Sequence, residues 1–172
     1  MNNFFQTAGL TKILEKLHIK PDSNNLEEIY SDYYDKNNNS EDIKELNKAI
    51  YNYFASFKIP DDPTIYDFLI LGLKPSDLIA TFNWDPLLVQ VYLRCSEFTD
   101  RLPQLAFLHG NVAVGYCEDC LNYGLINGKC SKCGKTFTPM QLLFPIKNKN
   151  YADNKIISAF GKKHKITLKK LL

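Results

Sequence analysis

The sequence predicts an α/β fold, in which helices alternate with the strands of a parallel sheet. Two short and nearly all-apolar runs, residues 77–82 and 104–108, have the composition of strands buried in such a sheet. A helical pattern over residues 85–95 separates the two runs, and another over residues 62–73 precedes them. This alternation of helices and strands is typical of an α/β domain.

Residues 1–76 are predicted to be mainly helical. The first helix is expected where apolar residues fall at helical spacing, at Leu10, Ile13, Leu14 and Leu17. A second is expected over residues 26–34, and a third after Ser40, a natural N-cap. The third helix carries an aromatic-rich stripe that we interpret as core packing: Ile43, Leu46, Ile50, Tyr53, Phe54 and Phe57. Asp62 and Pro63 then predict the start of the helix that runs through Leu73.

The composition places limits on the class of protein. The chain has 172 residues, of which 45% are hydrophobic, enough for one core and a small attached module. A net charge of +2 gives no indication of nucleic-acid binding. No apolar run reaches the roughly 18 residues needed to cross a membrane. The N-terminus lacks the basic start and apolar stretch of a signal peptide, so we expect a cytoplasmic protein.

Four of the five cysteines form two Cys-x-x-Cys pairs, Cys117 with Cys120 and Cys130 with Cys133. In a reducing compartment this spacing favours a metal site over disulfides. An Asn-Gly hairpin signal at residues 127–128 lets the second pair fold back onto the first. Four thiolates fill a tetrahedral coordination sphere and leave no position for water, so the pattern predicts structural Zn²⁺. An iron–sulfur cluster and a redox dithiol are the alternatives.

The composition changes around these pairs. Residues 115–138 are rich in Cys, Gly, Lys and Asn, and they are expected to form a zinc-ribbon module inserted in the α/β domain. Residues 139–172 are expected to return to the α/β core and continue as a basic tail with helical runs over 154–160 and 166–172. Cys95, which follows an apolar run, is expected to be a buried and inert thiol.

Residues 77–114 carry the second candidate site. Asn83 and Asp85 follow the first predicted strand, and His109 follows the second. The carboxyl ends of parallel strands lie at the same edge of a sheet, and this is the edge where α/β proteins bind ligands. An amide and a carboxylate there can orient a sugar hydroxyl, and an imidazole can take its proton near neutral pH. Each residue also has a purely structural interpretation: Asp85 as a helix N-cap, Asn83 as a turn residue and His109 as a strand-end turn.

The order of these motifs resembles the sirtuin family over about residues 77–145. Sirtuins carry Thr-x-Asn-x-Asp, then Leu-His-Gly, then two cysteine pairs and a downstream proline-led apolar stretch. This chain has these elements at residues 81–85, 108–110, 117–133 and 139–145. Phe82 and Trp84 depart from the usual family residues. The chain is therefore more similar to the divergent bacterial sirtuin-like group, several members of which consume NAD in antiviral defence.

The resemblance implies a fold, a cofactor and roles for individual residues. The sheet would be part of a Rossmann-like sheet, and the cysteine module would be the family's small zinc module. Thr81, Asn83 and Asp85 would bind NAD at its nicotinamide ribose, with Asn83 and Asp85 also catalytic. His109 would be the general base that helps to activate a ribose hydroxyl. The reaction would cleave the nicotinamide–ribosyl bond, with water or an acyl-lysine protein as acceptor.

The sequence lacks one element of that family. None of its eight glycines forms the Gly-x-Gly cluster that cradles a pyrophosphate at a helix N-terminus. We therefore expect a fragment, inactive by itself, with another chain completing the fold. A different class of function stays open beside the enzyme: a non-catalytic zinc-ribbon interaction module, or the remnant of a split sirtuin-like gene.

Overall fold

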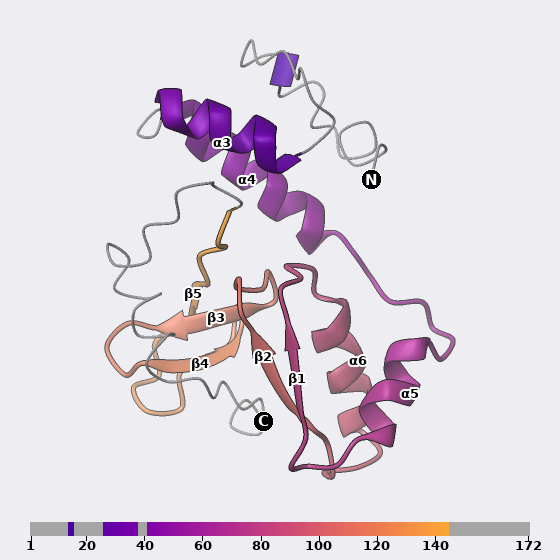
Figure 1. The fold of residues 1–172 in the computed structure, drawn as a ribbon. Helices are drawn as coiled ribbons and strands as arrows, with labels where there is room; N and C mark the ends of the chain where they lie inside the picture. The colour runs from indigo at the N-terminus through magenta and orange to yellow at the C-terminus, as the bar shows by residue number, and fades with distance from the viewer. Residues whose placement is uncertain (1–13, 16–25, 38–40, 145–172) are drawn as a thin grey trace.

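The computed structural model describes residues 14–15, 26–37 and 41–144. The elements in chain order are α3 (Leu26–Asn37), α4 (Glu41–Ala55), α5 (Ile65–Gly72), β1 (Leu78–Thr81), α6 (Leu87–Ser96), β2 (Gln104–Phe107), β3 (Val114–Cys117), β4 (Asn122–Leu125) and β5 (Thr138–Pro139). In the view of Figure 1, helices α5 and α6 lie to the right of the β1–β2 sheet, and strands β3, β4 and β5 lie to its left, beyond β2. None of the helices described is long and apolar enough to cross a membrane.

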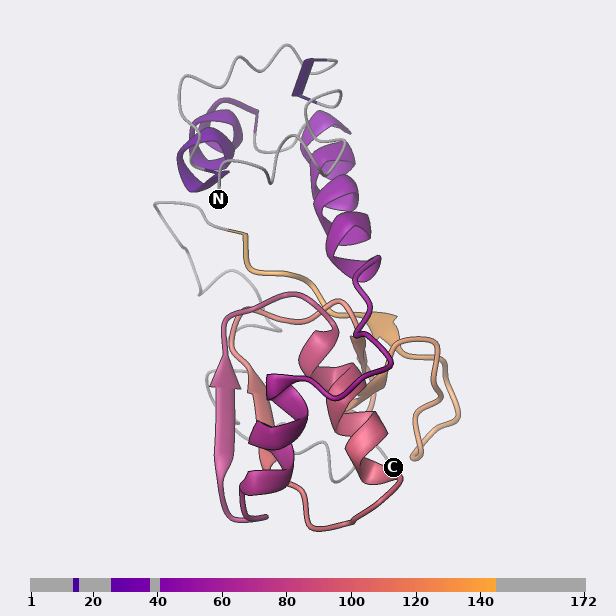
Figure 2. The same cartoon turned by 90° about the vertical axis from the view of Figure 1, so that its right-hand side faces the viewer.

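The parallel sheet predicted from the sequence is present and small. Strands β1 and β2 pair in parallel, with Ile79 opposite Leu105 and Thr81 opposite Phe107. Helix α6 connects them, and it packs with α5 on one face of the sheet (Figure 2). The apolar core between these layers includes Ile70, Leu88, Val91, Leu105 and Phe107. Each such side chain, once fully buried, contributes roughly 1.5–3 kcal/mol to the free energy of unfolding.

The two strands differ in burial, which corrects one expectation. In β2, Leu105 and Phe107 are essentially inaccessible to solvent. In β1, exposed and partly buried residues alternate, and Leu78 keeps 53% of its surface exposed. The prediction that residues 77–82 form a fully buried strand was therefore wrong. Among the described residues β1 pairs only with β2, so it is an edge strand with one uncovered face.

Helix α5 begins two residues later than Pro63, and a different residue caps it. Thr64 is the N-cap, and its backbone N–H and hydroxyl both donate to the Asp67 carboxylate, at 2.6 and 2.7 Å. Arg94 of α6 donates two further hydrogen bonds to the same carboxylate, at 2.8 and 2.6 Å. Mainly because of Arg94, the pKa of Asp67 is lowered to about 2. The prediction from Asp62 and Pro63 was therefore wrong by two residues, because the local capping box Thr64-x-x-Asp67 starts the helix.

The N-terminal helices form a second, smaller core. The predicted helix over residues 26–34 is confirmed as α3, and α4 buries the expected residues Ile43, Leu46 and Ile50. Phe57 lies beyond the end of α4 but packs edge-on against Tyr53 and Phe54. Helix α4 contacts the α/β part through the Tyr51 hydroxyl, which donates to the carbonyl of Val112 at 2.7 Å. The Ser40 cap, most of the helix expected over 10–17, and the tail helices lie outside the described residues.

A three-stranded antiparallel sheet follows, in the order β4–β3–β5. Strand β3 is buried throughout and pairs with β4 over its whole length, from Val114 opposite Leu125 to Cys117 opposite Asn122. Strand β5 pairs with the other edge of β3, with Gly115 opposite Pro139. After β5, Met140 joins the core formed by α6 and β2. The antiparallel sheet, which carries the cysteine module, therefore packs against the core of the parallel sheet.

Candidate metal centre and strand-end cluster

The four paired cysteines are brought together by two tight turns. In the first pair, Cys117 is the last residue of β3 and Cys120 lies in the connection to β4, where Leu121 adopts a positive φ of 48° directly after Cys120. The second pair is closed by Gly134, at φ 75°, whose N–H donates to the Cys130 carbonyl at 2.7 Å. The predicted Asn-Gly turn is also present, with Asn127 at φ 67°.

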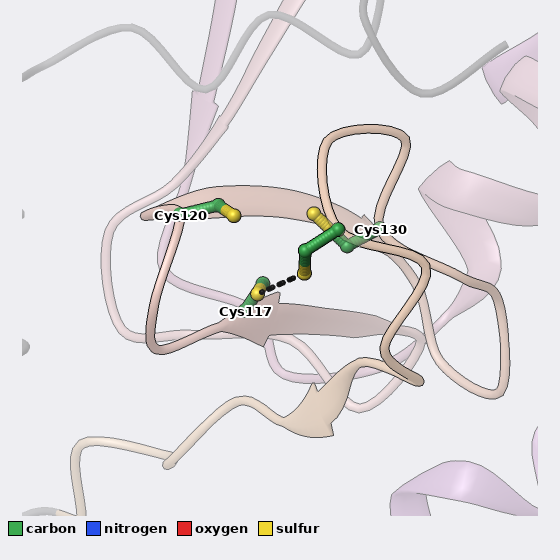
Figure 3. Close-up of side chains that lie close together, drawn as sticks. Cys117, Cys120 and Cys130 are labelled. Atoms are coloured by element: carbon green, nitrogen blue, oxygen red, sulfur yellow. Dashed lines mark hydrogen bonds between the residues drawn. The ribbon is translucent and has the colours of Figure 1, made fainter.

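The geometry of the cluster fits one metal ion. The four sulfur atoms all lie within 4.8 Å of one another, and those of Cys117 and Cys133 are 3.5 Å apart. Sulfurs at the corners of a tetrahedron around Zn²⁺, at about 2.3 Å from it, are separated by about 3.8 Å. Figure 3 shows the sulfurs of Cys117, Cys120 and Cys130 turned toward one shared space. The residues Cys117, Cys120, Cys130 and Cys133 can thus hold a metal ion, as the sequence predicted.

The pKa values of the cysteines differ within this cluster. The hydrogen bond with Cys133 and then burial raise the pKa of Cys120 to about 12. Burial also opposes ionisation of Cys130, but N–H donors from Lys132, Cys133 and Asn122 lower its pKa to about 6. The raised pKa of Cys120 and the lowered pKa of Cys130 mean that Cys130 ionises more readily than Cys120. A bound cation removes this difference, because it stabilises all four sulfurs in the ionised form.

The module has few apolar residues to hold it together. Phe137 is the one large side chain in the small core that includes Cys117 and Cys130. A Cβ atom on Gly124 would come within 1.9 Å of the Phe137 ring, so β4 needs a glycine there. Lys135 makes an ion pair with Asp119, which joins the two cysteine turns across the exposed surface. Because this local core is small, we expect a bound metal to stabilise the segment.

At the parallel sheet, three of the predicted residues do meet. Thr81, Asn83 and Asp85 line one hollow of about 170 Å³ between β1 and helices α5 and α6. The Thr81 hydroxyl accepts a hydrogen bond from the Asn83 backbone N–H at 3.0 Å. The Asp85 carboxylate accepts one from the Leu87 N–H at 3.1 Å, at the start of α6. Asp85 thus holds the entry to α6, but Pro86 and not Asp85 is the N-cap residue, so the N-cap interpretation of Asp85 was wrong by one position.

His109 stands apart from that hollow, although it follows β2 as predicted. Its ring packs edge-on against Phe82, with the ring centroids 4.7 Å apart. It does not contribute to the lining of the hollow beside Asn83 and Asp85. Its carbonyl accepts a hydrogen bond from the N–H of Leu143 at 2.9 Å. The structure thus places the histidine at the same edge of the sheet as the Asn-x-Asp turn, with Phe82 beside it.

Sequence reasoning missed one residue of this cluster. Asn111 is fully buried, and its side chain donates to the carbonyl of Asp85 at 2.6 Å and accepts from the N–H of Ala113 at 2.9 Å. Next to it, the N–H of Val112 donates to the carbonyl of Trp84 at 2.9 Å. Together these bonds fasten the Asn-x-Asp turn to the loop after His109. The only local signal was the sequence Gly110-Asn111, which reads as an ordinary turn.

Trp84, between the two polar residues, points away from the hollow. Its indole packs against Phe54 of α4 and against Phe144, with ring centroids 5.4 Å apart in both cases. A bulky residue at this position therefore anchors the turn to the N-terminal helices.

Comparison of the chain with protein-family models, with curated proteins and with solved structures finds no match. Function has to be argued from the two sites themselves.

Proposed function

We propose that this chain carries the ribose-handling part of a sirtuin-like, NAD-consuming site, supported by a structural zinc module. The observation that carries the proposal is the meeting of Asn83 and Asp85 in one hollow at the carboxyl end of β1, with His109 at the carboxyl end of the parallel neighbour β2. This is the edge at which α/β sheets bind ligands. In the proposed fold the two strands belong to a partial Rossmann-like sheet.

Each residue has a chemical role in this proposal. Thr81, Asn83 and Asp85 would hold the hydroxyls of the nicotinamide ribose, since an amide and a carboxylate together can donate to and accept from a diol. His109 would accept a proton from a ribose hydroxyl as the bond to nicotinamide breaks. The acceptor would be water, as in an NADase, or the acyl-lysine of a protein. The four cysteines would hold Zn²⁺, a closed thiolate site with a structural role.

The size of the hollow indicates how much of NAD these residues could hold. At about 170 Å³ it is smaller than the roughly 300–1,000 Å³ typical of ligand pockets. It would accommodate a ribose but not a dinucleotide. The pyrophosphate and adenosine would need groups from residues outside those described, or from another chain that completes the fold. We therefore propose that the activity belongs to the completed protein.

The proposal is tested by incubating the chain with NAD and measuring nicotinamide release by chromatography. Loss of release in His109→Ala, with retained release in Phe98→Ala, supports the proposed mechanism; Phe98 is an exposed residue that follows α6. Release that persists unchanged in His109→Ala would contradict the role of the histidine. If no nicotinamide appears even at high protein concentration, this chain by itself does not consume NAD.

A second candidate is a non-catalytic zinc-ribbon interaction module. One observation favours it: Leu121, at the first cysteine turn, leaves 56% of its surface exposed in a strained left-handed conformation. An apolar side chain presented in this way on a metal-stabilised turn suits contact with a protein partner. Under this alternative, Leu121→Ser would weaken partner binding and His109→Ala would not, whereas both would leave the zinc content unchanged.

A further inference from the structure

Helix α5 supplies one wall of the hollow at the carboxyl end of β1. Tyr66 and Leu69 line the hollow together with Thr81, Asn83 and Asp85. The two α5 residues are three positions apart, so they lie on the same face of the helix. Neither was predicted as part of the site, because no local pattern shows which strand a helix packs beside. An aromatic ring thus belongs to the same hollow as the amide and the carboxylate.

Tyr66 is held in place by its neighbours. Its side chain is partly buried and packs against the apolar core formed by α6 and β2. The carboxylate of the next residue, Asp67, accepts hydrogen bonds from Arg94 of α6 at 2.8 and 2.6 Å. These bonds fix α5 on α6, and Asp85 is bonded to the first turn of the same helix α6. Tyr66 and Asp85 are therefore both positioned through α6.

The charge of the hollow has one sign. Among the described residues that line it, Asp85 is the one with a charged side chain, and none is basic. Much of the remaining wall is apolar and consists of Ile79, Ala80, Leu88 and Phe107. A charge beside apolar walls acts more strongly than a charge in water. The face of a tyrosine ring also attracts cations. The hollow therefore favours a positively charged ligand over a neutral ligand of the same shape.

We propose that the hollow selects a ribosyl ring that carries positive charge, and that Asp85 and Tyr66 supply this selectivity. The selectivity rests on the proposed function, in which the bond between ribose and nicotinamide breaks. Nicotinamide leaves with the bonding electron pair, so the positive charge passes from its ring to the ribosyl carbon and the ring oxygen. The carboxylate and the aromatic ring bind this cationic state more tightly than the neutral sugar. Such differential binding accelerates the reaction.

Two small probes of one shape test the charge preference. Iminoribitol has a protonated nitrogen in place of the ring oxygen of ribose, whereas anhydroribitol keeps the neutral oxygen, and both carry the same hydroxyls. Each probe is added to the full chain, and its Kd is measured from the amide NMR shifts of residues 79–85. We expect iminoribitol to bind about tenfold more tightly than anhydroribitol. A ratio near one, or no binding of either probe, would overturn the proposal.

Matched variants assign the preference to the two residues. Asp85→Asn keeps the shape of the side chain and removes its charge, so the ratio of the two Kd values should fall from about ten to about two. Tyr66→Leu keeps an apolar wall and removes the aromatic ring, so the ratio should fall to about five. Phe68→Leu, at a position of α5 that is 68% exposed, should leave the ratio unchanged. Anhydroribitol is the internal reference, because a variant that only loosens the fold weakens the binding of both probes equally.

The same samples, assayed for nicotinamide release, separate the selectivity from the proposed function. A preference of about tenfold that both variants reduce, in a chain that releases no nicotinamide, supports the selectivity and contradicts catalysis by this chain. Release that depends on His109, together with a ratio near one, supports catalysis and overturns the selectivity. A ratio that stays unchanged in Asp85→Asn or in Tyr66→Leu overturns the role assigned to that residue, and so does an equal fall in Phe68→Leu.

Discussion

The side-chain amide of Asn111 donates to the backbone carbonyl of Asp85 across 2.6 Å, and this bond joins the loop after β2 to the turn after β1. The same side chain accepts from Ala113, so its two polar ends are satisfied by two different backbone groups. A buried residue with no exposed surface thus sets the distance between the two strand-end motifs. The position of Asp85 relative to His109 depends on a residue outside both motifs.

Replacement of Asn111 by alanine should destabilise the fold. It leaves the carbonyl of Asp85 and the N–H of Ala113 without a protein partner, and each buried unpaired group costs about 1–3 kcal/mol. We expect the free energy of unfolding in urea to fall by at least about 2 kcal/mol. Asn83→Ala is the matched control, because Asn83 is exposed and its backbone N–H, which the substitution keeps, donates to the Thr81 hydroxyl. A shift of less than about 0.5 kcal/mol in both variants would contradict this structural role.

Removal of the metal should unfold the cysteine module and leave the helical core. Structural zinc supplies about 10–16 kcal/mol in small thiolate domains, and this module has little apolar core beyond Phe137. Amide exchange measured before and after chelation should show loss of protection over residues 115–138, with α6 and β2 still protected. Cys130→Ser should give the same pattern without chelator. Zinc content measured by mass spectrometry should be one ion per chain, and protection that survives chelation would exclude a structural metal.

Gly124 should not tolerate a side chain. A Cβ atom there would lie 1.9 Å from Cε2 of Phe137, so Gly124→Ala forces the ring out of its place between the cysteine turns. We expect a loss of about 1–3 kcal/mol in stability, measured as a lower midpoint of metal-dependent unfolding. Gly72→Ala is the control, because a Cβ atom at Gly72 meets nothing within 4 Å. The double variant Gly124→Ala/Phe137→Leu should recover part of the loss, and failure to recover would place the strain elsewhere.

The ion pair of Asp67 and Arg94 should make stability depend on pH at the acid end. The folded-state pKa of Asp67 is about 2, below its ordinary value of 3.8, chiefly because Arg94 donates to the carboxylate. A lowered pKa contributes stability that is complete above the ordinary pKa and is lost as pH falls toward the folded-state value. Asp67→Asn should therefore be less stable than the parent at pH 7, and the difference should shrink between about pH 4 and pH 2.

Urea unfolding at several pH values measures this difference. Glu41→Gln is the control, because Glu41 pairs with Lys44 on the exposed surface of α4, where ion pairs contribute at most about 1 kcal/mol. Its effect should be small at every pH. A difference between Asp67→Asn and the parent that stays constant down to pH 2 would mean that the carboxylate charge contributes nothing.

Some features of this protein were readable from the sequence because their causes are local. Each Cys-x-x-Cys turn places two sulfurs on one side of a short loop, and the Asn-Gly turn at residues 127–128 returns the second pair to the first. The apolar runs of β1 and β2, and the helix between them, likewise reflect the composition of single segments. The α/β alternation and the four-cysteine cluster could therefore be predicted without any knowledge of contacts.

Other features were decided only by tertiary structure, because they depend on residues far apart in the chain. Arg94 of α6 binds the capping residue Asp67 of α5, and Asn111 fastens the turn that carries Asp85. Phe82 contacts His109 at the strand ends, while the hollow lined by Asn83 lies beside α5 and α6. A one-dimensional pattern tells which residues end a strand, but the burial of that strand is set by its neighbours. The sequence by itself determined the four cysteines that can hold a metal and the two parallel strands, and packing determined which faces and side chains are available to a ligand.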